Sequence, residues 1–439
     1  MPSELRDHPL RHALTQELHA RPFARIEAPQ RVTHLAMLSG EGAAEAERSH
    51  VARLCARFGA AAPGPEATHF MVDLGPLRFK WERHTEFSTY TFFQRPDAAE
   101  PEASSPPFDA PAIAQVPKDW LRALPGDLLV GIHLAMVPRA TPPRTLEALA
   151  QLFGSDNIAG SLVSGGAASV WMDFTIHDDG FGRILVHDRD LRPRQAGRLV
   201  QRLLEIETYR MMALLALPVA RRFGAELTEA RDRLTGIVGQ IQAISSLEDE
   251  RRLLENLTEL SAQIEGVAAS AVYRFGAARA YYALVRRRVE ELREARIEGL
   301  QTIHEFLDRR LAPAMRTCEA VADRLARITD RISRTGELLR TRVDIQLEAQ
   351  NSALLRSMNR RARLQLRLQQ TVEGLSVAAI SYYLVGLVGY AAKAAKAAGA
   401  PLEADLVAGL AIPVVVGLVA YGVWRLRRSI RHDVDRSGG

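Results

Sequence analysis

Cysteine and lysine are both scarce in this chain of 439 residues. The only cysteines, Cys55 and Cys318, lie far apart and each has no second cysteine nearby, which argues against a disulfide framework and a cysteine-based metal site. We therefore expect both to be small, buried, apolar side chains. The only lysines stand at positions 80, 118, 393 and 396, so almost all of the 57 basic residues are arginines.

The chain also lacks the signatures of several function classes. Residues 1–30 mix His, Arg, Glu and Pro without an apolar segment, so we expect no secretory signal and a cytoplasmic N-terminal domain. No Ser-His-Asp spacing, HExxH, paired zinc-ligand motif or nucleotide-binding loop occurs, so the sequence gives no support for an enzyme or for a bound cofactor. The net charge of +5 arises largely from arginines near two apolar runs, so we expect no nucleic-acid partner.

Charge is entirely missing from the two apolar runs, residues 375–392 and 406–424. Each run is long enough to cross about 30 Å of hydrocarbon as a helix rising about 1.5 Å per residue. The sequence therefore predicts a transmembrane hairpin over residues 375–424, with the lipid bilayer as a partner. Two apolar helices buried in a soluble core are the alternative interpretation.

The charges beside these runs indicate an orientation, because Lys and Arg next to a span are retained in the cytoplasm. Four arginines precede the first run and four follow the second: Arg360, Arg361, Arg363, Arg367, Arg425, Arg427, Arg428 and Arg431. The loop between the runs has Lys393 and Lys396 balanced by Glu403 and Asp405. We expect a multi-pass protein of the bacterial inner membrane, with both termini and a basic tail (425–439) in the cytoplasm, near phospholipid headgroups.

Small residues recur on faces of both predicted spans. Such residues let helices approach closely in lipid, either within one hairpin or between subunits. We expect the protein to form a homo-oligomer. The candidate packing residues are Gly386, Gly389, Gly409, Pro413 and Gly417. A polar pore lining would depend on little more than Ser376, Ser381, Tyr382 and Tyr383.

Residues 1–193 alternate between strand and helix patterns. Strands are expected at 32–39, 69–74, 77–84, 86–93, 128–137, 170–177 and 183–188, and helices at 43–59 and 145–153. Residues 96–117 are rich in Pro, Ala and Ser and predict an exposed loop. The fold class expected for this cytoplasmic domain is α+β, α/β-like in its alternation, with a largely antiparallel sheet.

Helical periodicity begins after Pro193 and continues to the apolar runs. Residues 194–312 predict a long antiparallel helical hairpin or coiled coil, broken near Pro218, with a capping box at 245–248 starting its second helix. Pro313 suits a helix start, so we expect a stalk helix over 313–374 that continues into the first span.

The strongest candidate for chemistry lies in the strand expected at 77–84. On one continuous strand Lys80, Glu82, His84 and Glu86 would share a face, where two carboxylates flank a histidine. Such a trio could bind a divalent cation or transfer a proton, with His19 as a fourth group. A solvated strand face with local ion pairs is the alternative, and a turn near Thr85 would separate the groups. A second group of acidic and histidine side chains gathers around the turn at 178–182 and could form an acidic cation site, or its aspartates could simply form the turn. Its members are Asp173, His177, Asp178, Asp179 and His187.

Four segments resemble a bacterial family of predicted membrane-anchored proteins whose function is not established. They are residues 17–23 (ELHARPF), 81–87 (WERHTEF), 205–210 (EIETYR) and 381–390 (SYYLVGLVGY). The resemblance extends over nearly the whole chain. It implies membrane anchoring but brings no catalytic or ligand-binding residue with it.

The expected layout also resembles that of CorA-type magnesium channels, which join a cytoplasmic domain to two spans through a stalk helix. Those channels have Gly-Met-Asn at the outer end of the first span, whereas residues 388–391 here are Val-Gly-Tyr-Ala. Two functions therefore stay open at the sequence level. One is an oligomeric channel or transporter gated by its cytoplasmic domain, and the other is a membrane-anchored scaffold that binds proteins not identified by the sequence.

Overall fold

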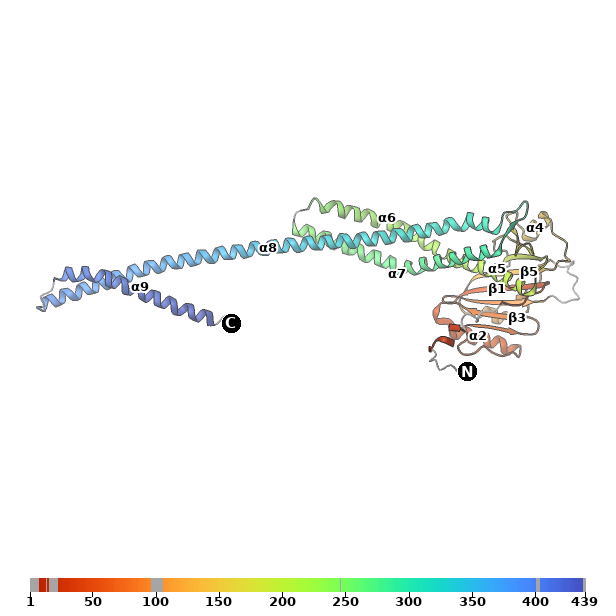
Figure 1. The fold of residues 1–439 in the computed structure, drawn as a ribbon, viewed down its shortest axis with the longest axis horizontal. Coiled ribbons are helices and arrows are strands. Elements are labelled where there is room, and N and C mark those ends of the chain that lie inside the picture. Colours follow the sequence, from red (N-terminus) through yellow and green to blue (C-terminus); the bar gives the residue numbers. More distant parts are fainter. Residues whose placement is uncertain are drawn as a thin grey trace. The chain divides into compact units, whose positions relative to one another are not determined.

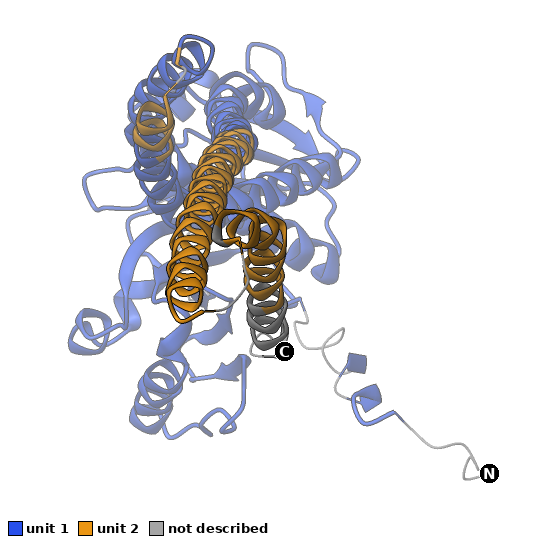
Figure 2. Cartoon of the chain, turned by 90° about the vertical axis from the view of Figure 1, so that its left-hand side faces the viewer, with its two compact units in different colours: residues 1–243, 255–336 blue, residues 244–254, 337–439 orange. Residues whose placement is uncertain are grey.

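The computed structural model describes residues 8–12, 14–15, 23–95, 106–244, 246–399 and 403–436, without the side chains of residues 404 and 426–436. The chain forms two compact units (Figure 2). Unit 1 consists of residues 1–243 and 255–336, and unit 2 consists of residues 244–254 and 337–439. Unit 1 has the sheet and most of the packed helices, whereas unit 2 has both apolar runs.

Within the described residues, unit 1 is built on a nine-stranded sheet with the strand order β2-β3-β4-β1-β5-β8-β7-β6-β9. Figure 1 labels β1, β3 and β5 of this sheet. Among the described strands β5 and β8 pair in parallel and the other pairs are antiparallel, so the expectation of a largely antiparallel sheet is confirmed. The strands are β1 (Gln30–Leu38), β2 (His69–Asp73), β3 (Arg78–Arg83), β4 (Ser88–Gln94), β5 (Asp127–Val137), β6 (Ala159–Val163), β7 (Ala168–Met172), β8 (Gly182–Asp188) and β9 (Ala295–Arg296).

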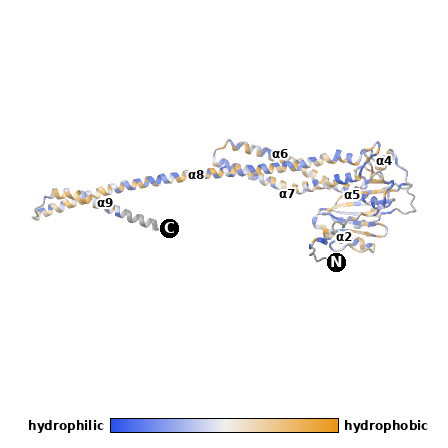
Figure 3. Ribbon diagram, viewed as in Figure 1, coloured by the Kyte–Doolittle hydropathy of each residue, from blue (hydrophilic) through white to orange (hydrophobic). Residues whose placement is uncertain are grey.

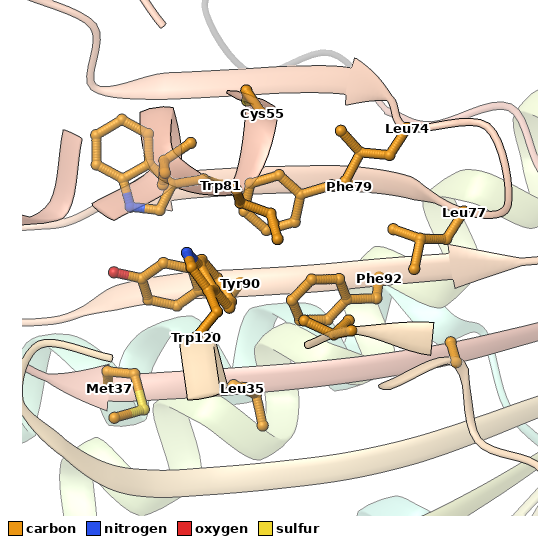
Figure 4. Packing of buried hydrophobic residues seen from close by; sticks show 14 residues of the cluster. Leu35, Met37, Cys55, Leu74, Leu77, Phe79, Trp81, Tyr90, Phe92 and Trp120 are labelled. Atoms are coloured by element: carbon orange, nitrogen blue, oxygen red, sulfur yellow. The ribbon is translucent and has the colours of Figure 1, made fainter. Parts of the chain in front are cut away.

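One face of β1, β3 and β4 holds an aromatic core (Figure 4). Alternation along β3 and β4 puts Phe79, Trp81, Tyr90 and Phe92 on this face. The core is closed by α2 (Ala44–Arg57) and α3 (Lys118–Arg122), which supplies Trp120. Its indole Nε1 donates to the His50 carbonyl at 2.8 Å, so helix α3 is fixed to helix α2 as well as to the sheet.

Four helices lie between β8 and α9 (Ala404–Arg436) along the described chain, with β9 between the third and the fourth. They are α5 (Pro193–Leu214), α6 (Ala216–Ile241), α7 (Leu247–Leu292) and α8 (Ile303–Ala397). The predicted break near Pro218 is confirmed, because α5 ends and α6 begins on either side of Leu215. The periodic apolar residues of α6 from Phe223 to Ile237 are buried, as the spacing predicts.

Polar contacts join the three long helices within unit 1. Arg233 of α6 donates to the Gln263 side chain of α7 at 3.1 Å, and Arg324 of α8 donates to the Thr228 hydroxyl of α6 at 3.2 Å. Ser246 caps the start of α7, because its Oγ accepts from the Asp249 amide at 3.1 Å. The cap thus lies one residue beyond the predicted box, and Ser245 lies outside the described residues.

The predicted start of the stalk helix at Pro313 is wrong. Helix α8 begins at Ile303 and contains Pro313 in its interior. A capping box fixes the earlier start, because Thr302 Oγ1 accepts from the Glu305 amide at 3.1 Å and Glu305 Oε2 accepts from the Thr302 amide at 3.0 Å. Glu294 adds a further cap by accepting from the amides of Ile303 and His304, each at 2.9 Å.

The strand expected at 170–177 is too long, and β6 was not expected. Strand β7 ends at Met172, because Asp173 Oδ1 accepts from the Thr175 amide at 3.3 Å and turns the chain. Phe174 then adopts a left-handed φ of 57° and stacks on Phe306 of α8, with ring centroids 4.3 Å apart. This stack, together with the Arg210 guanidinium over the Phe174 ring, offsets the unfavourable backbone conformation.

Residues 96–117 are only partly covered by the structure, and the described portion is not a simple exposed loop. It has a short 3-10 helix, η2 (Ala112–Gln115), and the side chains of Phe108 and Ala112 are buried. Apolar burial overrides the high Pro and Ser content there. The helix expected at 145–153 is α4 (Leu146–Phe153), capped by Thr145 Oγ1.

Unit 2 has the end of α8 and the helix α9 (Ala404–Arg436), with the two apolar runs standing out in Figure 3. Each helix has a described stretch long and apolar enough to cross a membrane. Only 11% of the stretch in α8 is buried, and none of Asp405–Arg425 is. Among the predicted packing residues, Gly389 faces α9, since a Cβ placed there would lie 3.7 Å from Ala408 Cβ. Packing at Gly386, Gly409, Pro413 and Gly417 stays a prediction.

A buried carboxylate on α2 gives the first test of the fold. Glu47 Oε2 accepts from Arg83 Nη1 at 2.8 Å and from Ser88 Oγ at 2.6 Å, and the Glu47 side chain is fully buried. We expect Glu47→Ala to lower the free energy of unfolding by about 3 to 5 kcal/mol, because it leaves a sheltered guanidinium without its counter-charge.

The measurement is chemical unfolding of the purified full chain, followed by tryptophan fluorescence. Glu45→Ala is the matched control on the same helix, since the Glu45 side chain is exposed and its pair with Arg48 is local. Equal midpoints for the two variants would contradict a structural role for Glu47.

Candidate ligand-binding site

The sheet face opposite the aromatic core has charged side chains. Because side chains alternate along β3, Lys80 and Glu82 point away from Phe79 and Trp81. Lys80 Nζ lies 2.9 Å from Glu82 Oε1, and only 6% of Lys80 is exposed. Lysine is rarely buried to this extent without a specific partner, so this face is a candidate site.

A cavity of about 280 Å³ lies between this sheet face and helix α5. Strands β1, β3 and β4 form one wall, α5 forms the other, and residues 23–26 and Arg288 of α7 close the sides. The lining residues are Phe23, Ala24, Ile26, His34, Lys80, Glu82, His84, Phe87, Thr89, Thr91, Phe93, Gly197, Val200, Gln201, Leu204, Glu205, Thr208, Tyr209 and Arg288.

His34 connects the two walls through hydroxyl groups. Its Nδ1 lies 2.8 Å from Thr91 Oγ1 of β4, and its Nε2 lies 3.1 Å from Thr208 Oγ1 of α5. Thr208 already donates its hydroxyl proton to the Leu204 carbonyl at 2.9 Å. The Thr208 oxygen is therefore an acceptor for His34, so we assign the proton of the neutral imidazole to Nε2 and infer that Thr91 donates to Nδ1.

The environment keeps His34 uncharged. Burial, followed by the positive charge of Lys80 and the proximity of His84, lowers the pKa of His34 to about 3. In an imidazolium both ring nitrogens would donate, so Thr91 would have to accept at Nδ1 instead of donating there. His34 is thus a neutral bridge rather than a proton carrier near pH 7.

Ion pairs hold the α5 wall against α7. Arg288 Nε donates to Glu205 Oε2, and Gln201 Nε2 donates to Glu205 Oε1 at 2.7 Å. Arg288 also donates to Glu291 at 3.0 Å, as does Arg202 at 3.1 Å. Burial opposes the charge on Arg288, whereas Glu205 and Glu291 favour it, and together they raise the pKa of Arg288. Each charge beside the cavity on this wall therefore has a partner of opposite sign.

A glycine lets the chain at residues 23–26 close the cavity edge. A Cβ on Gly197 would lie 1.7 Å from the Ala24 carbonyl oxygen, which no side chain can tolerate. The Ile26 amide donates to the Pro193 carbonyl at 3.1 Å one turn earlier. This close approach of backbone to helix places Phe23 and Ile26 along the cavity.

The predicted cation site is only partly assembled. Glu82 and His84 both line the cavity, but Glu86 does not. The His84 amide donates to the Phe87 carbonyl at 2.8 Å, so the chain turns after His84 and the common face expected from a continuous strand is lost. Glu86 instead accepts from both Nη groups of Arg274 on α7.

His19, the fourth candidate, lies outside the described residues. Within the described part of the chain, no three His, Cys, Asp or Glu side chains come close enough to hold a metal ion. In the acidic turn, Asp173 Oδ2 lies 3.1 Å from His177 Nε2. Asp179 lies near Arg183, so this turn contains local pairs.

Sequence reasoning missed the α5 wall of the cavity. Glu205, Thr208 and Tyr209 come from the segment 205–210, and Glu82, His84 and Phe87 come from the segment 81–87. Phe23 is the last residue of a third such segment, 17–23. The signal that could have found the cavity was therefore the set of segments with a family resemblance, three of which each contribute at least one described residue to its lining.

The neutral state of His34 predicts a pH dependence of stability. Its pKa is 6.5 in the unfolded chain and about 3 in the folded one. As the pH falls through this interval, His34 becomes protonated in the unfolded chain but stays neutral in the folded chain. The free energy of unfolding therefore decreases as the pH falls. Between about pH 7 and pH 4.5, we expect the decrease in the free energy of unfolding to be about 1 to 3 kcal/mol smaller in His34→Gln than in the unaltered protein.

Unfolding midpoints measured across this pH range would test the expectation. His304→Gln is the control, because the His304 side chain is exposed. An acid-side slope that is the same in His34→Gln and in the unaltered protein would contradict a buried neutral imidazole.

The comparisons with known proteins bear out one part of the sequence resemblance, namely that the chain belongs to a family whose function is not established. The model of the family described as "Protein of unknown function (DUF3422)" matches residues 6–430. No curated protein and no solved structure matches the chain. The match extends over the sheet, the cavity, the long helices and both apolar runs, and the chain therefore belongs to the DUF3422 family.

Proposed function

We propose that this protein is anchored in the bacterial inner membrane by two spans and binds a small molecule in the cytoplasmic cavity of unit 1. The observation that carries the proposal is the exposure of the two apolar runs. Leu387 is 64% exposed, Leu410 is 66% exposed and Leu418 is 65% exposed. By contrast, the periodic apolar residues of α6 are buried against the neighbouring helices.

Exposure distinguishes a span from a soluble core helix of the same composition. A core helix would have its apolar residues covered by the rest of its own chain, and these runs are almost uncovered. A signal sequence is also excluded for them, because both runs follow the whole sheet along the chain. Hydrocarbon is the medium in which such surfaces are stable.

The flanking arginines support one orientation for this hairpin. They precede the run in α8 and follow the run in α9, whereas Lys396 and Glu403 in the connection lie 3.4 Å apart and offset each other. Because basic residues next to a span are retained in the cytoplasm, both termini lie on the cytoplasmic side. Unit 1 and its cavity then face cytoplasmic metabolites.

A channel made of several copies is the second candidate. One observation favours it: α8 begins beside the sheet and continues without interruption through the first apolar run. The polar content of that run argues against it. The Ser376 hydroxyl donates to its own helix at the Val372 carbonyl, 2.8 Å away, so it is occupied as a donor. Ion flux through liposomes that contain the purified protein would favour the channel.

Cysteine labelling tests the membrane proposal. Both native cysteines are buried, so introduced ones can be labelled selectively. We expect a membrane-impermeant maleimide to label Ala398→Cys, in the connection between the runs, in intact spheroplasts. Ala353→Cys, on the exposed part of α8 before the first run, is the matched control and should react only after permeabilisation.

Labelling of both positions in intact spheroplasts, or of Ala353→Cys alone, would contradict the orientation. Recovery of the unaltered protein in the soluble fraction after cell lysis would contradict membrane anchoring itself. The reagent reports which side each residue faces, and fractionation reports whether a bilayer holds the protein, so the two results are independent.

A further inference from the structure

We propose that the cavity binds a small zwitterion with an apolar side chain, an α-amino acid being the simplest such ligand. The inference rests on the proposed function, since it requires the cavity to be a small-molecule site. It adds the chemical class of the ligand and the residues that select it. The assigned roles are Lys80 for the carboxylate of the ligand and Glu82 for its ammonium group.

The balance of charge around the cavity is the first argument. Its permanent charges form two pairs of opposite sign, Lys80 with Glu82 and Arg288 with Glu205. A ligand with a single net charge would add an uncompensated charge to a space sheltered from water, which is costly. A zwitterion brings one charge of each sign and leaves the balance intact.

The unused hydrogen-bonding capacity of the first pair is the second argument. Lys80 is more than nine-tenths buried, and its ammonium group has three donors. Its one partner among the described residues is Glu82 Oε1, so two donors remain for a ligand. Glu82 has a second carboxylate oxygen beside the cavity. A cation and an anion thus lie side by side, as a carboxylate and an ammonium on one carbon atom require.

The second pair is less available. Arg288 is held by both Glu205 and Glu291, and Glu205 is held by both Arg288 and Gln201. Their hydrogen bonds fix the α5 wall to α7 and leave little capacity for a ligand. The polar end of the ligand therefore lies on the sheet wall, at β3.

Apolar side chains supply the rest of the recognition surface. Ile26, Phe93, Val200 and Leu204 line the cavity together with Phe23 at its edge. The volume of about 280 Å³ lies just below that of typical ligand sites, about 300 to 1,000 Å³. The space therefore suits a metabolite the size of an amino acid better than a nucleotide or a lipid.

Calorimetric titration of the purified full chain in detergent tests the ligand class. The probes are L-leucine, L-methionine and L-phenylalanine, each compared with the amine that lacks its carboxylate and the acid that lacks its ammonium group. We expect at least one amino acid to bind, and both singly charged counterparts to bind about tenfold more weakly or worse, because each leaves one buried charge unpaired.

Two substitutions assign the roles of the pair. In Lys80→Met, Glu82 keeps its charge, so the affinity for the amine relative to that for the amino acid should increase by at least about tenfold. In Glu82→Gln, Lys80 keeps its charge, and preference should change by a similar factor toward the acid. The double variant Lys80→Met, Glu82→Gln removes both buried charges, so it remains informative if a single variant fails to fold. It should fold and lose the preference for the zwitterion.

Arg274→Met with Glu86→Gln is the matched control, because it removes a sheltered ion pair that does not line the cavity. This variant should keep the preference of the unaltered protein. A changed preference in the control, or an unchanged one in the double variant, would overturn the assigned roles.

The outcomes separate this inference from the proposed function. If a singly charged probe binds as tightly as its amino acid, the zwitterion is wrong while the cavity remains a small-molecule site. If no probe binds, the zwitterion is overturned, and the small-molecule role of the cavity loses its support. The labelling experiment on the two spans is unaffected by either result.

Discussion

The buried pair of Lys80 and Glu82 is the interaction on which the site depends. Strand alternation puts both residues on the face opposite Phe79 and Trp81, so one short strand serves the aromatic core and the charged cavity wall together. Neither charge could stay under α5 without the other, since a lone buried charge costs far more than a pair. The pair therefore ties the cavity to the strand that also builds the core.

Helix α5 completes this arrangement because its side chains match the sheet wall. Thr208 accepts from the neutral His34, and Glu205 accepts from both Arg288 and Gln201. Gly197 allows the backbone near Ala24 to approach. Each contact satisfies a polar group or removes a clash that burial would otherwise make unfavourable. What remains between the walls is a space with balanced charge and an apolar lining, which suits a zwitterion.

Much of the fold could be predicted from sequence where one signal dominates. Alternation at β3 and β4, periodic apolar residues in α6 and α7, and the charge-free runs all gave elements that the structure contains. Pro313 misled because α8 tolerates it in the interior, where its φ fits the helix but its missing N–H removes one backbone hydrogen bond. The capping box at Thr302 and Glu305 was also overlooked. Asp173 ended a strand that alternation alone would have continued.

The site was harder to predict because it depends on contacts between distant segments. Lys80, Glu82 and His84 were identified as one group from their spacing, but the turn after His84 directs Glu86 to Arg274 instead. Thr208 on the α5 wall and Arg288 of α7 lie more than a hundred residues further along the chain. No local pattern states that α5 covers β3, so the cavity emerged only from the three-dimensional arrangement.

An experimental structure of the full chain in lipid nanodiscs with a bound apolar amino acid would test the central claim most directly. The account predicts ligand density between β3 and α5, with the carboxylate within hydrogen-bonding distance of Lys80 Nζ and the ammonium group beside Glu82. Density for the ligand outside this cavity, or a cavity closed by its own side chains with Lys80 in solvent, would contradict the account.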